Sequence, residues 1–113
     1  MTLGEKQRLF AKLFGEFLVW IYAHGYEVTF GDAYRDPRLH GAVGEKAGYG
    51  ASSSCHKLRL AVDLNLFFEG KFLASTEAHR VLGEKWESMH YLCSWGGQFN
   101  DGNHYSFEHE GKR

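Results

Sequence analysis

Several sequence features are rare or absent in this chain of 113 residues, and each absence argues against a class of protein. The two cysteines, Cys55 and Cys93, are too few for a disulfide framework and do not form a C-x-x-C metal or redox pair. No apolar run approaches the ~20 residues that span a bilayer, so we expect no membrane insertion. A formal net charge of −1, without a cluster of lysine and arginine, gives no reason to expect a nucleic-acid partner.

The N-terminal segment also lacks the features of an export signal. Its sequence, MTLGEKQRLFAKLF, interrupts the apolar pattern with charges and has no small-residue cleavage site. We therefore expect the protein to be cytoplasmic as synthesised. Hydrophobic residues make up 43% and charged residues 24% of the chain, which is typical of one globular domain spanning residues 1–113. We expect this domain to act as a monomer.

The chain does contain periodic segments, which glycine-rich connections join. Apolar side chains recur at helical spacing across residues 10–21, where Thr2 is placed to cap the helix and Gly25 to end it. Val28 and Phe30 then alternate with polar neighbours, which indicates a short strand.

The second half of the chain alternates between strand and helix patterns. A strand is predicted over residues 59–68, and a hairpin turn joins it to residues 71–75. Helical turns are predicted within residues 75–92, where Gly83 could interrupt the helix, and a closing strand is predicted over residues 104–109. These elements predict an α+β fold in which helices flank a small antiparallel sheet.

Two histidines and one carboxylate stand out on the predicted strands. Asp63 lies on the strand face opposite a stripe of leucines, and His56 stands at the entrance of the same strand. In a fully extended chain these two residues would be about 23 Å apart, so residues 56–59 must leave strand geometry if the two are to meet. If the closing strand is a neighbour, His104 joins them. Two imidazoles and one carboxylate form the ligand set of a catalytic zinc site, whose fourth position is left to water.

Two further residues could supply the chemistry of hydrolysis. Asp101 precedes His104 by three residues across an Asp-Gly-Asn turn and could accept a proton from the attacking water, although Asp-Gly is also a common turn pair. Arg35 follows a separate strand and could stabilise a developing oxyanion or bind a substrate carboxylate, or it could pair with a neighbouring aspartate. The long loop over residues 36–53 is the candidate rim of the substrate site.

These motifs resemble those of a known family of zinc peptidases. The resemblance covers roughly residues 26–109 and rests on Ser54-x-His56, Ala61-x-Asp63-Leu64, and Asp101-x-x-His104 near a Trp-Gly-Gly segment. The sequence is similar to the D-alanyl-D-alanine carboxypeptidase type, which includes VanY-like carboxypeptidases and phage L-alanyl-D-glutamate endopeptidases (endolysins). The segment WGGQFNDGNHYSFEH resembles the small phage members in particular.

The resemblance implies a Hedgehog/DD-peptidase-like fold and a role for each motif. His56, Asp63 and His104 would bind Zn²⁺. Asp101 would be the general base, Arg35 would stabilise the transition state, and Ser54 would support the ligands or contact the substrate. The implied substrate is the stem peptide of bacterial peptidoglycan, cut at an amide beside a D-amino acid. The enzyme would act on the cell wall after release, which requires a separate membrane-permeabilising protein.

The sequence departs from the family pattern at two positions. Arg59 stands where members often have glycine, and Asp101 stands where glutamate is frequent. Three alternatives stay open: a D-alanyl-D-alanine carboxypeptidase, a non-catalytic zinc module that binds cell-wall peptide, and a cysteine hydrolase using Cys55 or Cys93. Asp63 could also pair with an arginine. We expect the remaining histidines to be mostly structural or on the surface: His24, His40, His79, His90 and His109.

Overall fold

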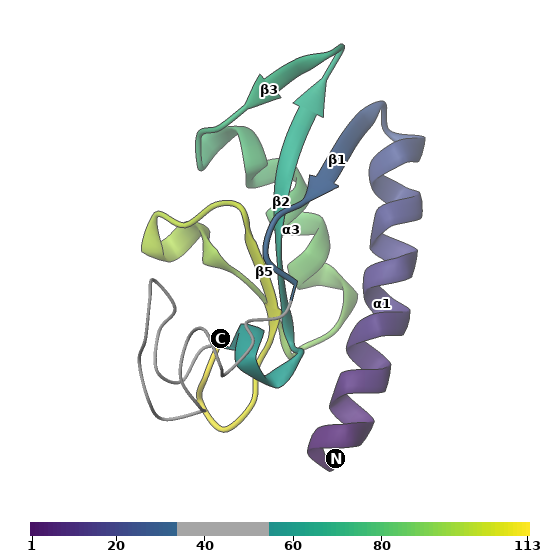
Figure 1. Ribbon diagram of the computed structural model, residues 1–113, viewed down its shortest axis with the longest axis vertical. Helices are drawn as coiled ribbons and strands as arrows, with labels where there is room; N and C mark the ends of the chain where they lie inside the picture. The colour runs from purple at the N-terminus through teal and green to yellow at the C-terminus, as the bar shows by residue number, and fades with distance from the viewer. Residues whose placement is uncertain (34–54) are drawn as a thin grey trace.

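The helices and strands form two layers, as Figure 1 shows for the computed structural model, which describes residues 1–33 and 55–113. In chain order the elements are α1 (Leu3–Ala23), β1 (Tyr26–Phe30), the 3₁₀ helix η1 (Cys55–Leu58), β2 (Ala61–Phe68), β3 (Lys71–Leu73), the 3₁₀ helix η2 (Glu77–His79), α3 (Arg80–Met89), β4 (Cys93–Trp95), the 3₁₀ helix η3 (Gly96–Phe99) and β5 (His104–Phe107).

The first helix confirms both predicted boundaries. Thr2 and Glu5 form a capping box: Oγ1 of Thr2 accepts the N–H of Glu5 at 3.1 Å, and the Glu5 carboxylate accepts the N–H of Thr2 at 2.8 Å. At the other end Gly25 has a φ of +85°, a left-handed conformation that glycine adopts without strain.

The strands form one five-stranded antiparallel sheet in the order β1-β2-β5-β4, with β3 also paired to β2. The predicted α+β class is therefore confirmed. β2 is central because it pairs with three other strands. Its first residues pair with β5 in a register that sets Asp63 directly opposite His104.

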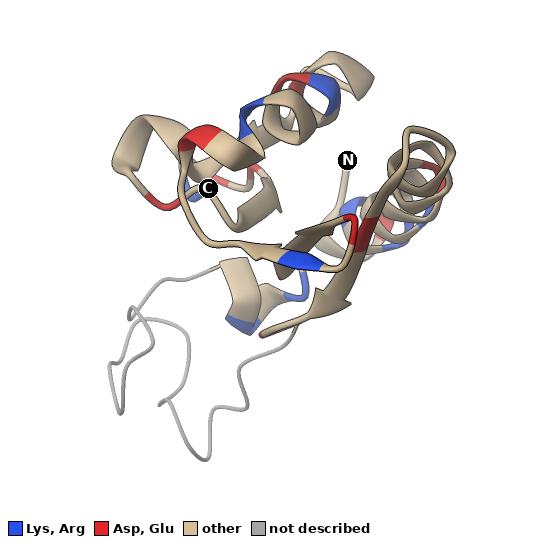
Figure 2. Cartoon of the chain, turned by 90° about the horizontal axis from the view of Figure 1, so that it is seen from above, with Lys and Arg blue, Asp and Glu red and all other residues tan. Residues whose placement is uncertain are grey.

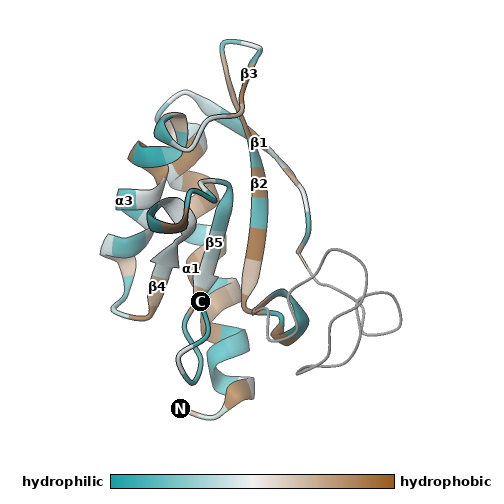
Figure 3. Cartoon of the chain, turned by 90° about the vertical axis from the view of Figure 1, so that its left-hand side faces the viewer, coloured by the Kyte–Doolittle hydropathy of each residue, from teal (hydrophilic) through white to brown (hydrophobic). Residues whose placement is uncertain are grey.

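Both helices cover the same face of the sheet, where the aromatic core lies. Phe17 of α1 packs against Trp86 of α3 and Tyr105 of β5, with ring centroids 5.2 Å and 5.4 Å away. All three side chains are fully buried, and each such burial contributes ~1.5–3 kcal/mol. Seen from the side in Figure 3, β2 shows alternating brown and teal bands, since Leu64 and Leu66, which are buried, alternate with the polar Asp63 and Asn65. The polar positions of β2 face away from the helices.

β2 starts two residues later than the predicted strand, and this later start explains how His56 reaches Asp63. The strand begins at Ala61 because the preceding residues form η1, where the N–H of Leu60 donates to the carbonyl of Cys55 at 2.9 Å. Arg59 closes this turn with a φ of +57°, in the left-handed region that favours glycine. The prediction that residues 56–59 leave strand geometry is confirmed.

The remaining differences between the predicted and the observed elements lie in the C-terminal half of the chain. The predicted helical segment is shorter than residues 75–92, and Gly83 does not break α3, because the glycine is buried against the Trp95 ring. β4 was not predicted, since its three residues directly precede two glycines. The closing strand stops at Phe107 instead of residue 109, because His109 turns back to pair with Lys112.

Acidic and basic residues both occur along the two helices, as the red and blue segments of Figure 2 show. α1 and α3 each carry acidic residues interspersed with basic ones. Among the described residues, no helix combines the length and apolar character needed to cross a lipid bilayer.

Candidate metal centre

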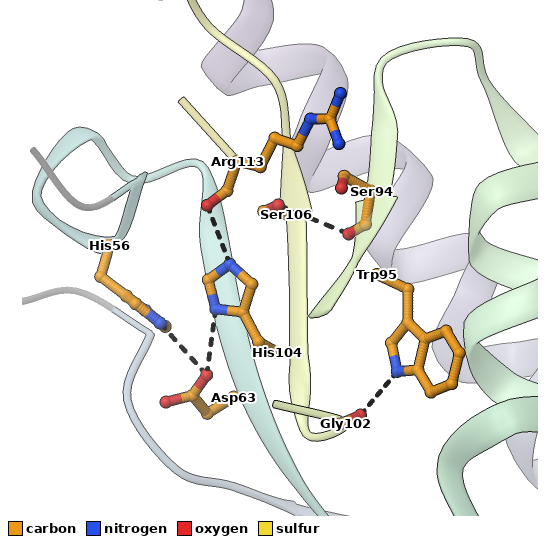
Figure 4. Close-up of polar contacts among 8 residues, drawn as sticks. All are labelled: His56, Asp63, Ser94, Trp95, Gly102, His104, Ser106 and Arg113. Carbon is orange, nitrogen blue, oxygen red and sulfur yellow. Dashed lines mark hydrogen bonds and ion pairs between the residues drawn. The ribbon is translucent and has the colours of Figure 1, made fainter. Parts of the chain in front are cut away.

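Three predicted side chains meet on the face of the sheet opposite the helices. Nε2 of His56 lies 3.1 Å from Oδ1 of Asp63, and Nδ1 of His104 lies 3.4 Å from the same oxygen (Figure 4). One donor atom from each residue lies within 4.8 Å of the other two. The predicted convergence of His56, Asp63 and His104 is therefore confirmed, and the group could hold a metal ion.

The spacing of Asp63 from each histidine suits a small tetrahedral ion. Ligands that bind zinc at ~2.0–2.1 Å in tetrahedral geometry lie about 3.3 Å from one another. The two contacts to Asp63, at 3.1 Å and 3.4 Å, are close to that value. His56 is 1% exposed and the side chains of Asp63 and His104 are 17% and 13% exposed, so the donors lie near the surface without being freely solvated.

The backbone fixes each ligand independently. Asp63 and His104 share a face because they are register partners on β2 and β5. Asp63 is also tied to the segment after β1, where its carbonyl accepts the N–H of Gly31 at 2.8 Å and its N–H donates to the carbonyl of Asp32 at 2.8 Å. His56 comes from the η1 turn, which brings it back over the start of β2.

A main-chain contact orients the His104 ring. Its Nε2 lies 3.2 Å from a main-chain oxygen of Arg113, which would accept the Nε2–H when a metal ion occupies Nδ1 (Figure 4). Nδ1, the other ring nitrogen, faces Asp63 at 3.4 Å. A metal-binding imidazole is commonly held in this way by a hydrogen bond from its other nitrogen.

Asp63 is held as an anion. Burial alone would raise the pKa of this carboxyl group, but the hydrogen bonds with His104 and His56 and their charge interactions outweigh it, so the pKa lies well below its usual range. A carboxylate must be deprotonated to bind a metal ion, so this environment prepares Asp63 for that role.

Asp101 lies beside the metal centre and outside its donor group. Its side chain is exposed, and its carbonyl accepts the N–H of His104 at 3.1 Å, which closes the predicted Asp-Gly-Asn turn. Asp101 lines a polar cavity of about 190 Å³ together with Asn65, which follows Asp63 by two residues on β2. The backbone bond to His104 therefore ties the Asp101 turn to one of the three metal-centre residues.

The loop around Asp101 is held by two residues that the sequence did not mark as functional. The indole N–H of Trp95 donates to the carbonyl of Gly102 at 2.7 Å, and Oγ1 of Thr76 accepts the N–H of Gly102 at 3.2 Å. For the contact of Trp95 with Gly102, the Trp-Gly-Gly segment was the sequence feature that could have indicated it. No local pattern indicates that Thr76 reaches this loop.

The other predicted site residues fall into two groups. Arg35, Ser54 and the loop over residues 36–53 lie outside the described residues. The additional histidines that are described make structural contacts: His79 Nδ1 with the Tyr105 hydroxyl at 2.7 Å, His24 with the Trp20 carbonyl at 2.8 Å, His90 with the Leu92 N–H at 3.1 Å, and His109 with Lys6 at 3.1 Å.

Both cysteines are buried and poorly suited to nucleophilic chemistry. Burial raises the pKa of Cys55 and of Cys93 to about 12. The Cys55 thiol also donates to the Phe107 carbonyl at 3.8 Å. A nucleophilic cysteine needs an accessible thiolate, so this environment disfavours the cysteine hydrolase.

Comparison of the chain with protein-family models, curated proteins and solved structures finds no match. The site is therefore interpreted from its own geometry.

Proposed function

We propose that this chain is a zinc peptidase of the D-alanyl-D-alanine carboxypeptidase and L-alanyl-D-glutamate endopeptidase type, with a Hedgehog/DD-peptidase-like fold. Its substrate is the stem peptide of bacterial peptidoglycan, and its reaction is the endolysin-like hydrolysis of an amide beside a D-amino acid. The observation that carries this proposal is the convergence of His56, Asp63 and His104, whose donor atoms lie within 4.8 Å of one another.

The donor set favours a catalytic role over a purely structural one. Structural zinc sites in proteins are usually closed by four protein ligands, whereas catalytic sites keep three and leave one position open. The metal-donor group in the described part of the chain has three members. When bound there, zinc would supply Lewis-acid chemistry that polarises a carbonyl and makes water nucleophilic near neutral pH.

The protein's own residues would then carry out the proton transfers. His56, Asp63 and His104 hold the ion, and the Arg113 main-chain oxygen fixes the tautomer of His104. Asp101 accepts a proton from the attacking water and delivers it to the leaving nitrogen as the C–N bond breaks.

The surroundings of Asp101 support this assignment. Asp101 is exposed and lines the polar cavity with neutral hydrogen-bonding residues such as Asn65, Asn100 and Asn103. These side chains are suited to bind peptide amides. In the proposed reaction Arg35 stabilises the oxyanion and Ser54 contacts the substrate, as the family resemblance implies.

The decisive test is incubation of the zinc-loaded protein with intact peptidoglycan, with and without a chelator, followed by mass spectrometry of the released fragments. We expect chelator-sensitive release of fragments with new L-alanine carboxyl ends and D-glutamate amino ends. Asp101→Asn should lower turnover by at least ~10²-fold, because it removes a positioned general base, and should leave the zinc content unchanged.

Other outcomes point to the alternatives. Loss of only a terminal D-alanine would identify a carboxypeptidase. Binding of wall fragments by a zinc-loaded protein that releases no product would identify a non-catalytic module. Full activity in Asp101→Asn would refute the assignment of the base.

A further inference from the structure

A buried glycine anchors the loop that carries Asp101. Gly102 is buried whereas Asp101 is exposed. Both main-chain polar groups of Gly102 are bound by side chains from other parts of the fold: its N–H donates to Thr76, which precedes η2, and its carbonyl accepts the indole N–H of Trp95 on β4 (Figure 4 shows the second contact).

The packing around this anchor leaves little room for movement. A Cβ added to Gly102 would overlap the backbone and side chain of Thr76. The Trp95 ring occupies the space where a Cβ of Gly83 or Gly97 would lie. The backbone N–H of Trp95 also donates to the Glu87 carboxylate at 3.2 Å, which links β4 to α3. The contact partners of Gly102 are therefore themselves held by the fold.

The Thr76 hydroxyl is not engaged in capping the adjacent helix. Thr76 occupies the N-cap position of η2 without a side-chain capping bond. Ser75 takes the local role instead, because its Oγ accepts the N–H of Ala78 at 3.1 Å. Among the described residues, the Thr76 hydroxyl forms a side-chain hydrogen bond only with Gly102, and Thr76 also lines the polar cavity that Asp101 lines.

We propose that Thr76 and Trp95 are positioning residues, which hold Asp101 at the cavity beside the metal centre through Gly102. This inference rests on the proposed function of Asp101 as the general base. His104 donates its N–H to Asp101, but its strand pairing with Asp63 and its contact with Arg113 also hold it in place. Loss of the anchor, that is, of the hydrogen bonds of Gly102 with Thr76 and Trp95, should therefore reduce the rate of proton transfer and leave zinc binding intact. A displacement of ~1 Å in a catalytic group can lower a rate by ~10²-fold.

Four variants of the full chain test this inference. Thr76→Val removes the acceptor for the Gly102 N–H at nearly constant shape, and Thr76→Ser keeps it. Trp95→Phe removes the indole N–H. Trp86→Phe is the matched control, because the Trp86 indole is also buried and donates to a main-chain carbonyl, that of Ser106, at 2.9 Å. Each zinc-loaded variant is compared with wild type for kcat, KM, zinc content and hydrogen exchange of the Gly102 amide.

We expect Thr76→Val and Trp95→Phe to lower kcat by ~10- to 100-fold with unchanged zinc content and little change in KM. Thr76→Ser should retain the wild-type kcat, and Trp86→Phe should lose less than Trp95→Phe. Exchange of the Gly102 amide should accelerate at least ~10-fold in Thr76→Val and remain unchanged in Trp86→Phe. A wild-type kcat in Thr76→Val, or equal losses in the two tryptophan variants, would overturn the inference.

The exchange measurement separates this inference from the proposed function. If wild-type protein with bound zinc hydrolyses no wall fragment, the proposed function fails, whereas the anchor is still tested. Faster exchange of Gly102 in Thr76→Val would then support the anchor as a structural fact. An unchanged exchange rate would overturn it whatever the activity.

Discussion

Replacing Asp63 with asparagine tests whether the three converging side chains bind a metal ion. Asparagine keeps the size of the side chain but removes the negative charge that lies 3.1 Å from His56 and 3.4 Å from His104. The change removes one of three protein ligands. We therefore expect zinc affinity to fall by more than ~100-fold, the upper range for loss of a residue that only supports a ligand.

The effect on thermal stability follows from binding linkage. Zinc at about 1,000 times its dissociation constant stabilises the wild-type fold by about 4.1 kcal/mol. At the same zinc concentration, a site weakened ~100-fold retains about 1.4 kcal/mol. Since ~1 kcal/mol shifts Tm by roughly 4 °C in a domain of this size, the zinc-induced rise in Tm should fall from about 16 °C to about 6 °C or less.

Thermal unfolding followed by circular dichroism, with saturating zinc or with a chelator, measures this difference. Asp101→Asn is the matched control, because it makes the same chemical change at a carboxylate outside the donor group. We expect this control to keep the full zinc-induced rise. The assignment of the metal centre would be refuted if Asp63→Asn kept the full zinc-induced rise in Tm, or if both variants lost the same part of that rise.

Three further predictions follow from individual residues. In the presence of a chelator, the free energy of unfolding should fall as pH drops below about 4, because the pKa of Asp63 is lower in the folded state than in the unfolded state. Urea titrations at two pH values measure this fall, with Asp63→Asn as the comparison. Gly83→Ala should destabilise the fold by ~1–3 kcal/mol, because the added Cβ would overlap Trp95. Gly15→Ala should stabilise the fold by ~0.5–1 kcal/mol, because open space surrounds Gly15 in the helix. Urea unfolding of both variants tests this contrast. Arg59→Val should be ~1–2 kcal/mol less stable than Arg59→Gly in the same assay, because the φ of +57° is left-handed.

The ligand set could be predicted from the sequence because strand periodicity carries the necessary information. Alternation places Asp63 on the polar face of its strand, and the same rule orients His104 on the closing strand. The position of His56 required one more inference, a turn before β2, and the structure has that turn as η1. Short-range patterns therefore oriented the ligands, whereas their convergence depended on the pairing of the two strands and on the family resemblance.

Three features that depend on tertiary contacts were not predicted from the sequence. Helix propensity marks Gly83 as a point of weakness, but its contact with Trp95 overrides that preference. β4 was missed because its three residues gain their stability from pairing with β5, which local propensity does not register. The contact of Thr76 with Gly102 is likewise a product of tertiary packing.

The register pair Asp63–His104 has a kinetic consequence. The two ligands lie on strands that are far apart in the chain, so the complete metal centre forms only after β2 and β5 have paired. If that pairing follows the transition state, bound zinc would act mainly on the unfolding rate, since interactions that form late slow unfolding without accelerating folding. Zinc would then prolong the lifetime of the folded protein, and stopped-flow unfolding with and without zinc would show how early the two strands pair.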